Sequence, residues 1–266
     1  IGQYGVDHDI LAQQRSFFGI HRVEARDEGR VRFLIHGTTL HGYQDLRRGQ
    51  ASQPQGYYSR VGPLGQVFTG LLAHHRLPNQ VGLVGLGAGA SLCHGRAPQS
   101  WTVFEIDPAV VKIAQDASLL SYWAECAGRM STQVQIGDAR LTLGQEDDHR
   151  FDLLILDAYN SDAIPVHLLT VEAFHLYLRK IKPGGLLLLH LTNRHLDLES
   201  VFAAITGQMN LPSLIQNHQD ASWAALSTDE GSLAFLAVDA RWRSPKVENG
   251  VRPWTDDYSN ILSILK

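Results

Sequence analysis

The chain has 266 residues, of which 44% are hydrophobic and 19% charged, so it can bury a large core as one domain or as one domain with a small appendage. Its net charge is −4 and no cluster of Lys and Arg stands out, which argues against a nucleic-acid partner. There is no signal peptide and no apolar run long enough to span a bilayer. The chain starts at Ile1 rather than Met, which predicts a processed form or a domain of a longer protein.

The two cysteines, Cys93 and Cys126, match neither a metal-ligand pattern nor a disulfide framework. Each is most simply a small buried apolar residue. So few cysteines fit a reducing compartment.

The first 64 residues predict a small β unit followed by a loop. Residues 1–14 are polar and show little pattern, whereas residues 20–24 and 31–35 favour short strands. Asp27, Glu28 and Gly29 form the predicted hairpin turn between them. Residues 45–63 are rich in Gly, Gln, Pro and Ser and predict a loop. The predicted boundary places residues 1–64 in the β unit and residues 65–266 in a catalytic, nucleoside-binding domain, which opens with a helix at 65–75.

From residue 81 onward, apolar strands alternate with helices. Strands are predicted at residues 81–85, 101–106, 134–136, 151–156 and 186–191. Helices are predicted at 90–96, 109–118, 170–181 and 197–209, the second of them opened by Asp107 and Pro108. Residues 224–225 and 233–238 are predicted as late strands, followed by a polar tail. The alternation predicts an α/β fold, a Rossmann-like parallel sheet with helices on both faces.

A glycine-rich turn follows the first of these strands, in the segment VGLVGLGAGA. Gly85, Gly87 and Gly89 fall where the strand must turn sharply into a helix, and without Cβ atoms their backbone can approach a ligand closely. Glu105 ends the next strand, where a carboxylate can accept two hydrogen bonds from a ribose diol. These residues predict a nucleoside site at the carboxyl edge of the sheet.

Further carboxylates follow the later strands. Asp138 comes after the third strand, where it can accept a hydrogen bond from the exocyclic amine of an adenine. Asp157 ends the fourth strand, at the edge where open α/β sheets bind ligands. With Tyr159 and Asp162 it suits a cationic amine, because one carboxylate can hold the ammonium while the other removes a proton. For Asn160 and Asp162, a cap on the following helix is the alternative interpretation.

Several other features give weaker signals. His36, His41 and His167 match no compact zinc spacing, so loop or core histidines are the simpler interpretation and no metal is expected. The segment WTDDYSN, which contains Asp257, either folds back to add carboxylates to the site or forms a polar tail anchored by Trp254. Neither a G-x-S-x-G motif nor a Walker P-loop occurs, which argues against a serine hydrolase and a P-loop NTPase.

The motifs GLGAGA, FEIDP, GDA, LDAYNSDAIP and KPGG follow in the order found in spermidine synthases, and residues 15–195 resemble this family of polyamine aminopropyltransferases. The resemblance implies the class I S-adenosylmethionine-dependent methyltransferase fold with a leading β unit, and a homo-oligomer. The segments RSFFG, HGTTLHGYQ, PVHLLT and WTDDYSN are similar to a bacterial branch in which such a domain follows a membrane-embedded, transporter-like region. That similarity implies a cytoplasmic location, at the inner membrane if the domain is part of a longer protein.

Carried over by position, the resemblance implies a role for each motif residue. Glu105 would bind the ribose, Asp138 with Ala139 the adenine, and Asp157 would take the proton from the attacking amine. Gln44 and Tyr58 lie where the family uses a Gln and a Tyr over the reacting groups. Together, the residue patterns and the resemblance predict Asp157 and Tyr58 as catalytic residues, Gly85, Gly87, Gly89, Glu105, Asp107, Asp138, Ala139 and Gln44 as donor-binding residues, and Tyr159, Asn160, Asp162 and Asp257 as amine-binding residues.

Two positions depart from the family pattern. Ala88 stands where the family's glycine loop has an Asp that holds the donor's amine, and Asn160 replaces a second amine-anchoring Asp. The leading expectation is transfer of an aminopropyl group from decarboxylated S-adenosylmethionine to a small-molecule amine, which releases methylthioadenosine. One alternative is an enzyme that acts on intact S-adenosylmethionine, by methyl or aminocarboxypropyl transfer or by intramolecular cleavage. Another is a sensor domain that binds a nucleoside or polyamine without turnover.

Overall fold

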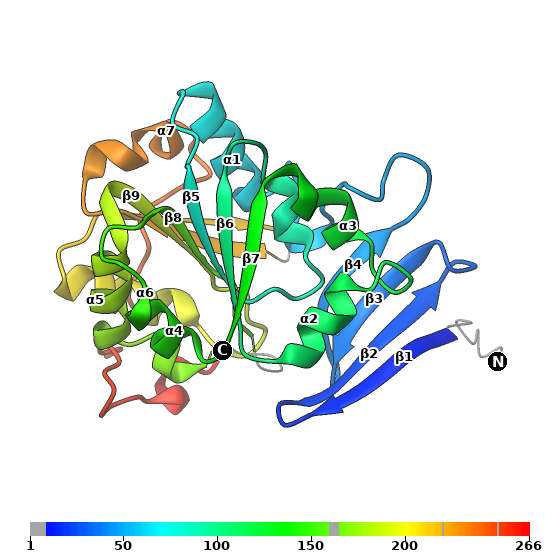
Figure 1. Cartoon of the computed structure of the whole chain (residues 1–266). Coiled ribbons are helices and arrows are strands. Elements are labelled where there is room, and N and C mark those ends of the chain that lie inside the picture. Colours follow the sequence, from blue (N-terminus) through cyan, green and yellow to red (C-terminus); the bar gives the residue numbers. More distant parts are fainter. Residues whose placement is uncertain (1–8, 160–164, 220, 249) are drawn as a thin grey trace.

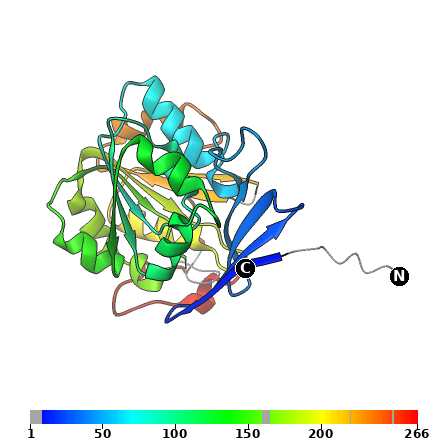
Figure 2. The same ribbon diagram turned by 45° about the vertical axis from the view of Figure 1, so that its right-hand side comes forward.

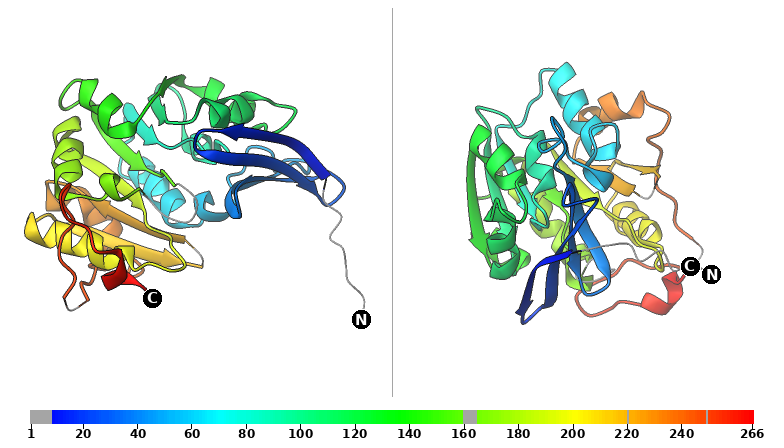
Figure 3. Two further views of the ribbon diagram at one scale, coloured as in Figure 1. Left: turned by 90° about the horizontal axis from the view of Figure 1, so that it is seen from below. Right: turned by 90° about the vertical axis from the view of Figure 1, so that its right-hand side faces the viewer.

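Two β-sheets organise the part of the chain that the computed structural model describes, which is residues 9–159, 165–219, 221–248 and 250–266. A four-stranded sheet comes from the N-terminal region, and a seven-stranded sheet follows it (Figure 1). Turned views show the smaller sheet set to one side of the larger one (Figures 2 and 3). No helix among the described residues is long and apolar enough to cross a membrane.

The four-stranded sheet is an antiparallel meander of β1 (Asp9–Ser16), β2 (Gly19–Arg26), β3 (Val31–His36) and β4 (Thr39–Asp45). The predicted hairpin turn is confirmed, because Asp27, Glu28 and Gly29 all have positive φ between β2 and β3. Strand β1 was missed, since its sequence shows little alternation and its conformation depends on pairing with β2. The short 3₁₀ helix η1 (Gly56–Tyr58) and helix α1 (Pro63–Ala73) lead to the larger sheet.

The seven-stranded sheet has the order β10-β11-β9-β8-β5-β6-β7. Its parallel core is β5 (Gln80–Val84), β6 (Ser100–Glu105), β7 (Ser131–Ile136), β8 (Phe151–Leu156) and β9 (Ile181–His190). The hairpin of β10 (Ser213–His218) and β11 (Ala221–Leu226) pairs antiparallel with β9 through β11. The predicted α/β sheet is therefore confirmed, with an antiparallel strand added near one edge.

Helices cover the parallel strands as the alternation predicts (Figure 1). They are α2 (Pro108–Gln115), α3 (Tyr122–Cys126), α4 (Ala139–Gln145), α5 (Val171–Lys180), α6 (Leu198–Gln208) and α7 (Ala234–Ala237). Successive side chains of β5 point to opposite faces of the sheet and pack in different hydrophobic clusters. Leu83 belongs to the cluster that includes α1 and the four-stranded sheet, whereas Val84 belongs to the cluster with α5 and α6. The smaller sheet thus shares a hydrophobic core with the larger one.

Two short segments differ from the prediction. Residues 233–238, predicted as a strand, lie in a 3₁₀ turn and α7, because Leu233 and Leu236 are buried three residues apart while Val238 is 84% exposed. A short apolar run cannot be assigned by periodicity alone, which explains the error. Residues 90–96, predicted as a helix, contain only the 3₁₀ helix η2 (Ala90–His94).

The two cysteines form a disulfide, which contradicts the prediction that each is a free apolar side chain. Cys93 lies in η2 and Cys126 in α3, and both are buried. They are 33 residues apart, so no local pattern indicates that they meet. Disulfides persist mainly in oxidising compartments, so the scarcity of Cys no longer supports a reducing one.

We expect this disulfide to stabilise the fold by about 3–4 kcal/mol, because it constrains a loop of this length in the unfolded chain. Urea unfolding followed with and without reductant measures the effect. The Cys93→Ala/Cys126→Ala double variant is the control, since its unfolding midpoint should not respond to reductant. Equal midpoints for the wild-type chain under both conditions would contradict the prediction.

Candidate active site

A cavity of about 680 Å³ lies at the carboxyl ends of the five parallel strands. Its floor comes from the residues that follow β5, β6, β7, β8 and β9, at the edge where α/β sheets bind ligands. The four-stranded sheet and η1 supply the facing wall, through residues that include His21, His36, His41, Tyr57 and Tyr58. One cavity thus collects side chains from both sheets.

The glycine loop after β5 lies against this cavity. Gly85, Gly87 and Gly89 all have positive φ, at +87°, +51° and +85°, which favours glycine. A Cβ on Gly85 would overlap the carbonyl oxygen of Asp157, so the loop can pass the end of β8 only without a side chain there. Gly85 and Gly87 line the cavity, whereas Gly89 faces Tyr122.

Glu105, at the end of β6, is 7% exposed and faces the cavity. Its Oε2 accepts a hydrogen bond from Leu86 N at 2.8 Å, and its Oε1 accepts one from Asp107 N at 3.0 Å. A carboxylate oxygen can accept more than one hydrogen bond, so this carboxylate suits the two hydroxyls of a ribose. Burial raises the pKa of Glu105 above its ordinary value, although the backbone hydrogen bonds oppose the shift.

Asp107 joins the two sheets as well as lining the cavity. It caps α2 by accepting from Ala109 N, as predicted, and its Oδ2 accepts from Ser16 Oγ at 2.5 Å and lies 2.8 Å from His21 Nε2. Burial alone would raise the pKa of Asp107, but the hydrogen bonds from Ser16, Ala109 and His21 outweigh it and lower the pKa. The carboxylate is therefore held ionised between β1, β2 and α2.

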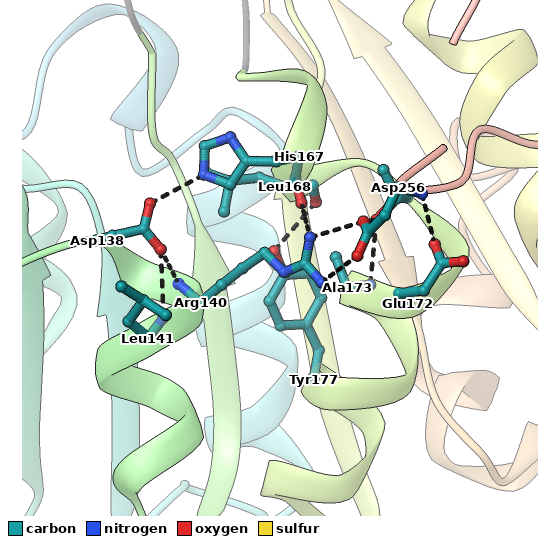
Figure 4. Close-up of polar contacts among 10 residues, drawn as sticks. Asp138, Arg140, Leu141, His167, Leu168, Glu172, Ala173, Tyr177 and Asp256 are labelled. Carbon is teal, nitrogen blue, oxygen red and sulfur yellow. Dashed lines mark hydrogen bonds and ion pairs between the residues drawn. The ribbon is translucent and has the colours of Figure 1, made fainter. Parts of the chain in front are cut away.

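Asp138 caps α4 at the end of β7 (Figure 4). Its Oδ1 accepts from Arg140 N and Leu141 N, and its Oδ2 lies 3.0 Å from His167 Nε2. Asp138, Ala139 and His167 all line the cavity. A histidine therefore accompanies the two residues that were predicted to recognise adenine.

The C-terminal tail folds back, but not into the cavity. Asp256 forms a two-pronged ion pair with Arg140, at 2.7 and 2.8 Å (Figure 4). It also accepts a hydrogen bond from Thr170 Oγ1 at the start of α5. Trp254 is 2% exposed and anchors the segment, as one of the two interpretations predicted. Asp257 is exposed and does not line the cavity, so its predicted contact with the amine is not supported.

Asp157 directly follows β8, and its side chain is 5% exposed. The Tyr58 hydroxyl is hydrogen-bonded to it, and burial, with the charge of Asp157 second, raises the pKa of Tyr58 well above its ordinary value. Tyr58 is therefore a neutral hydrogen-bond donor. The structure thus brings together the two residues predicted to be catalytic, from η1 and β8.

His190, which ends β9, lies at the site although it was not predicted there. Its Nδ1 lies 2.7 Å from Asp157 Oδ1, its ring stacks on Trp223 of β11, and it lines the cavity. The Tyr159 hydroxyl donates to the His190 carbonyl at 2.6 Å. A signal was present, since a single His ends the apolar strand that neighbours the one followed by Asp157.

Other predicted residues lie elsewhere. Gln44 is fully buried, and its amide bonds with the Ala51 carbonyl and with Ser121, so it is not part of the cavity lining and its predicted donor contact is not supported. Asn160 and Asp162 lie outside the described residues. Gln44 instead holds the loop after β4 against the start of α3.

Histidines are gathered on the wall formed by the smaller sheet. His36 stacks on His21 with ring centroids 4.5 Å apart, and His41 lies 5.3 Å from His36. Burial, together with the neighbouring His21, lowers the pKa of His36. No group of three or more His, Cys, Asp or Glu side chains is arranged to hold a metal within the described ranges.

The raised pKa of Glu105 predicts pH-dependent nucleoside binding. On acidification Glu105 takes up a proton at a higher pH than an exposed glutamate and loses the charge with which it accepts from ribose hydroxyls. We therefore expect the Kd for methylthioadenosine to rise as the pH falls from about 8 to about 5, measured by calorimetry. In Glu105→Gln, binding at the higher pH should be about 10- to 100-fold weaker and its pH dependence reduced.

Glu125→Gln, at an exposed position of α3, is the matched control and should bind like the wild-type chain. A thermal melt of each variant checks that the fold is retained. An unchanged pH dependence in Glu105→Gln would contradict the assignment of Glu105 to the ribose.

Part of the sequence is similar to that of a known enzyme. No family model matches the chain. A polyamine aminopropyltransferase from Vibrio vulnificus (strain CMCP6) is 32% identical over 100 residues, which is 36% of this chain and 31% of the relative. The chain thus matches about a third of the length of this curated relative.

Three solved structures are similar in fold to this chain over most of its length. A probable spermidine synthase from Corynebacterium glutamicum ATCC 13032 has a TM-score of 0.68 at 16% identity, and covers 94% of this chain and 98% of its own. The spermidine synthase from Thermotoga maritima has a TM-score of 0.60 at 13% identity, over 90% and 81% of the two chains. A spermidine synthase in complex with the transition-state analogue AdoDATO gives 0.60 at 14% identity, over 90% and 82%. The chain therefore has the fold of spermidine synthases, and part of its sequence is similar to that of a polyamine aminopropyltransferase.

Proposed function

We propose that this chain is an aminopropyltransferase that moves the aminopropyl group of decarboxylated S-adenosylmethionine to an amine and releases methylthioadenosine. The observation that carries the proposal is the position of Asp157 and Tyr58 in the same cavity as Glu105 and Asp138. One side of the cavity thus offers acceptors for a nucleoside, and the other offers a buried carboxylate for an amine. The sequence similarity to a polyamine aminopropyltransferase supports the same assignment.

In the proposed reaction, the lone pair of a neutral amine nitrogen attacks the aminopropyl carbon that is bonded to the sulfonium. The carbon–sulfur bond breaks, and its electron pair stays on sulfur, which becomes the neutral thioether of methylthioadenosine. Because the new nitrogen–carbon bond leaves the amine positively charged, a proton passes from nitrogen to Asp157. A sulfonium leaves without acid assistance, so catalysis consists mainly of orientation and of this proton transfer.

The nucleoside half would use the strand ends of β6 and β7. Glu105 would accept from the ribose hydroxyls, and Asp138 from the adenine amine, for which its Oδ2 keeps a lone pair beside His167. Gly85 and Gly87 would allow the backbone to approach the donor. Asp107 would act by holding the smaller sheet over this half of the cavity.

The amine half would be bounded by aromatic side chains. Tyr57, Tyr58 and Tyr159 all line the cavity near Asp157. Burial, with the charge of Asp157 second, raises the pKa of Tyr159 well above its ordinary value, so this phenol is neutral too. Neutral aromatic faces with one carboxylate suit an alkylammonium chain, because the rings attract cations while they contact methylene groups.

Ala88 bears on the choice of donor. It is 2% exposed and does not line the cavity, and a Cβ on Gly42 of β4 would lie 3.0 Å from its methyl group. An Asp at this position would therefore need space that β4 occupies. The glycine loop of this chain offers no carboxylate to the donor's amino group, so recognition of the aminopropyl chain would depend on the Asp157 side of the cavity.

The proposal is tested by incubating the chain with decarboxylated or intact S-adenosylmethionine, with and without a diamine, and by measuring methylthioadenosine chromatographically. We expect methylthioadenosine only with the decarboxylated donor and the diamine together. Asp157→Asn should lower kcat by about 10²-fold or more while methylthioadenosine binding stays within about twofold, because only proton transfer is lost.

Asp27→Asn is the matched control, since this exposed hairpin residue keeps its turn conformation as Asn and lies outside the cavity. Methylthioadenosine released from the intact donor would instead favour the alternative substrate. Binding of both ligands with no product would favour a sensor.

A further inference from the structure

We propose that His190 is a positioning residue that orients Asp157 for proton transfer, and that Thr192 holds His190 in the neutral tautomer that carries its proton on Nδ1. This inference rests on the proposed function, because an oriented base matters only if Asp157 accepts a proton. Its basis is a chain of hydrogen bonds that runs from the cavity to the backbone of β11.

The first link joins two buried side chains from neighbouring parallel strands. His190 Nδ1 and Asp157 Oδ1 are 2.7 Å apart, and the side chains are 4% and 5% exposed. An ionised carboxylate can only accept hydrogen bonds, so Nδ1 carries the proton and donates it to Oδ1. The bond fixes the carboxylate plane relative to the sheet.

The second link determines the state of the other ring nitrogen. His190 Nε2 lies 2.7 Å from Thr192 Oγ1, and this oxygen also accepts from Ser222 N at 2.8 Å. A hydroxyl has one proton to donate, and the Ser222 N–H already occupies one of its acceptor positions. Donation from Thr192 to a bare Nε2 satisfies both groups and leaves the imidazole neutral.

Packing keeps the imidazole in this orientation. Its ring stacks on Trp223 at 4.6 Å between centroids and 8° between planes, and the Trp223 indole N–H donates to the Tyr57 carbonyl at 3.2 Å. Trp223 is 1% exposed. A ring held on one face by a buried indole and at both nitrogens by hydrogen bonds has little freedom to turn.

The neutral state has a chemical consequence. An imidazolium would form an ion pair with Asp157 and weaken its tendency to take a proton from an amine. A neutral Nδ1–H donor orients the carboxylate without cancelling its charge. Tyr58 is a second hydrogen-bond partner of Asp157. His190 and Tyr58 thus orient the carboxylate, and its remaining acceptor positions can bond the amine.

Two substitutions separate hydrogen bonding from stacking. His190→Phe keeps a ring against Trp223 and removes the donor, whereas His190→Asn keeps an N–H near the position of Nδ1 and removes the ring. We expect His190→Phe to lower kcat about 10- to 100-fold with the donor KM within about twofold, and His190→Asn to lower kcat by less, no more than about threefold. His195→Asn, at an exposed His in the segment between β9 and α6, should leave both constants unchanged.

The tautomer provides a readout that does not depend on activity. Long-range ¹H–¹⁵N correlation spectra of the ¹⁵N-labelled chain distinguish Nδ1–H, Nε2–H and doubly protonated imidazoles, and the His190 signals are those lost in His190→Asn. We expect the Nδ1–H pattern near neutral pH. In Thr192→Val, which keeps the imidazole but removes the hydroxyl, we expect this pattern to change and kcat to fall while the donor KM holds.

The outcomes are distinguishable from failure of the proposed function. If the wild-type chain transfers no aminopropyl group, the proposed function fails, and the spectra still test the hydrogen-bond chain. An Nε2–H or doubly protonated His190 in the wild-type chain would overturn the inference. So would a His190→Phe variant that is folded and keeps the wild-type kcat, or equal losses in the Phe and Asn variants.

Discussion

The site depends on the register with which β5 pairs with both of its parallel neighbours. Val84 stands opposite Phe104 of β6 and Leu156 of β8. The residues that follow these three are Gly85, Glu105 and Asp157, respectively. The glycine turn and two carboxylates therefore lie side by side at the edge of the sheet. Hydrogen bonds from Gly85 N to Phe104 O and from Asp157 N to Val84 O continue the pairing to that edge. A shift of β6 or β8 by one residue would turn the carboxylate of that strand toward the opposite face of the sheet.

The smaller sheet adds a second wall to the cavity at this edge. Ser16 and His21 bind Asp107, and the His41 carbonyl lies so close to the glycine loop that a Cβ on Gly87 would approach it to 3.1 Å. Val23 and Leu34 belong to the same hydrophobic cluster as Leu83, so the contact is also apolar. Burial of charged groups such as Glu105 and Asp107 strengthens their interactions, because the dielectric constant around them is lower than in water.

The four carboxylates of the cavity differ in their hydrogen-bond partners, and this difference is consistent with their different proposed roles. Glu105 accepts from two backbone N–H groups, which suits a fixed binding contact. Asp107 and Asp138 also cap helices, which places them at the starts of α2 and α4. Asp157 contacts only side chains in the bonds described, His190 and Tyr58, whose protons can respond to a change in its charge. Among the four, Asp157 is therefore the one whose surroundings suit proton transfer.

Local sequence features were sufficient to predict the parallel strands, the glycine turn and the row of carboxylates, because apolar runs, glycine spacing and strand ends can be identified without tertiary contacts. It did not indicate the Cys93–Cys126 disulfide or the contact of His190 with Asp157, since these pairs are separated by 33 residues along the chain. Gln44 was predicted at the site from the resemblance, and Asp257 from a tail that could fold back. In the fold, Gln44 holds a loop and Asp257 is exposed. Tertiary structure decided these cases, because a side chain's role depends on which distant residues the packed sheets and helices bring within hydrogen-bond distance.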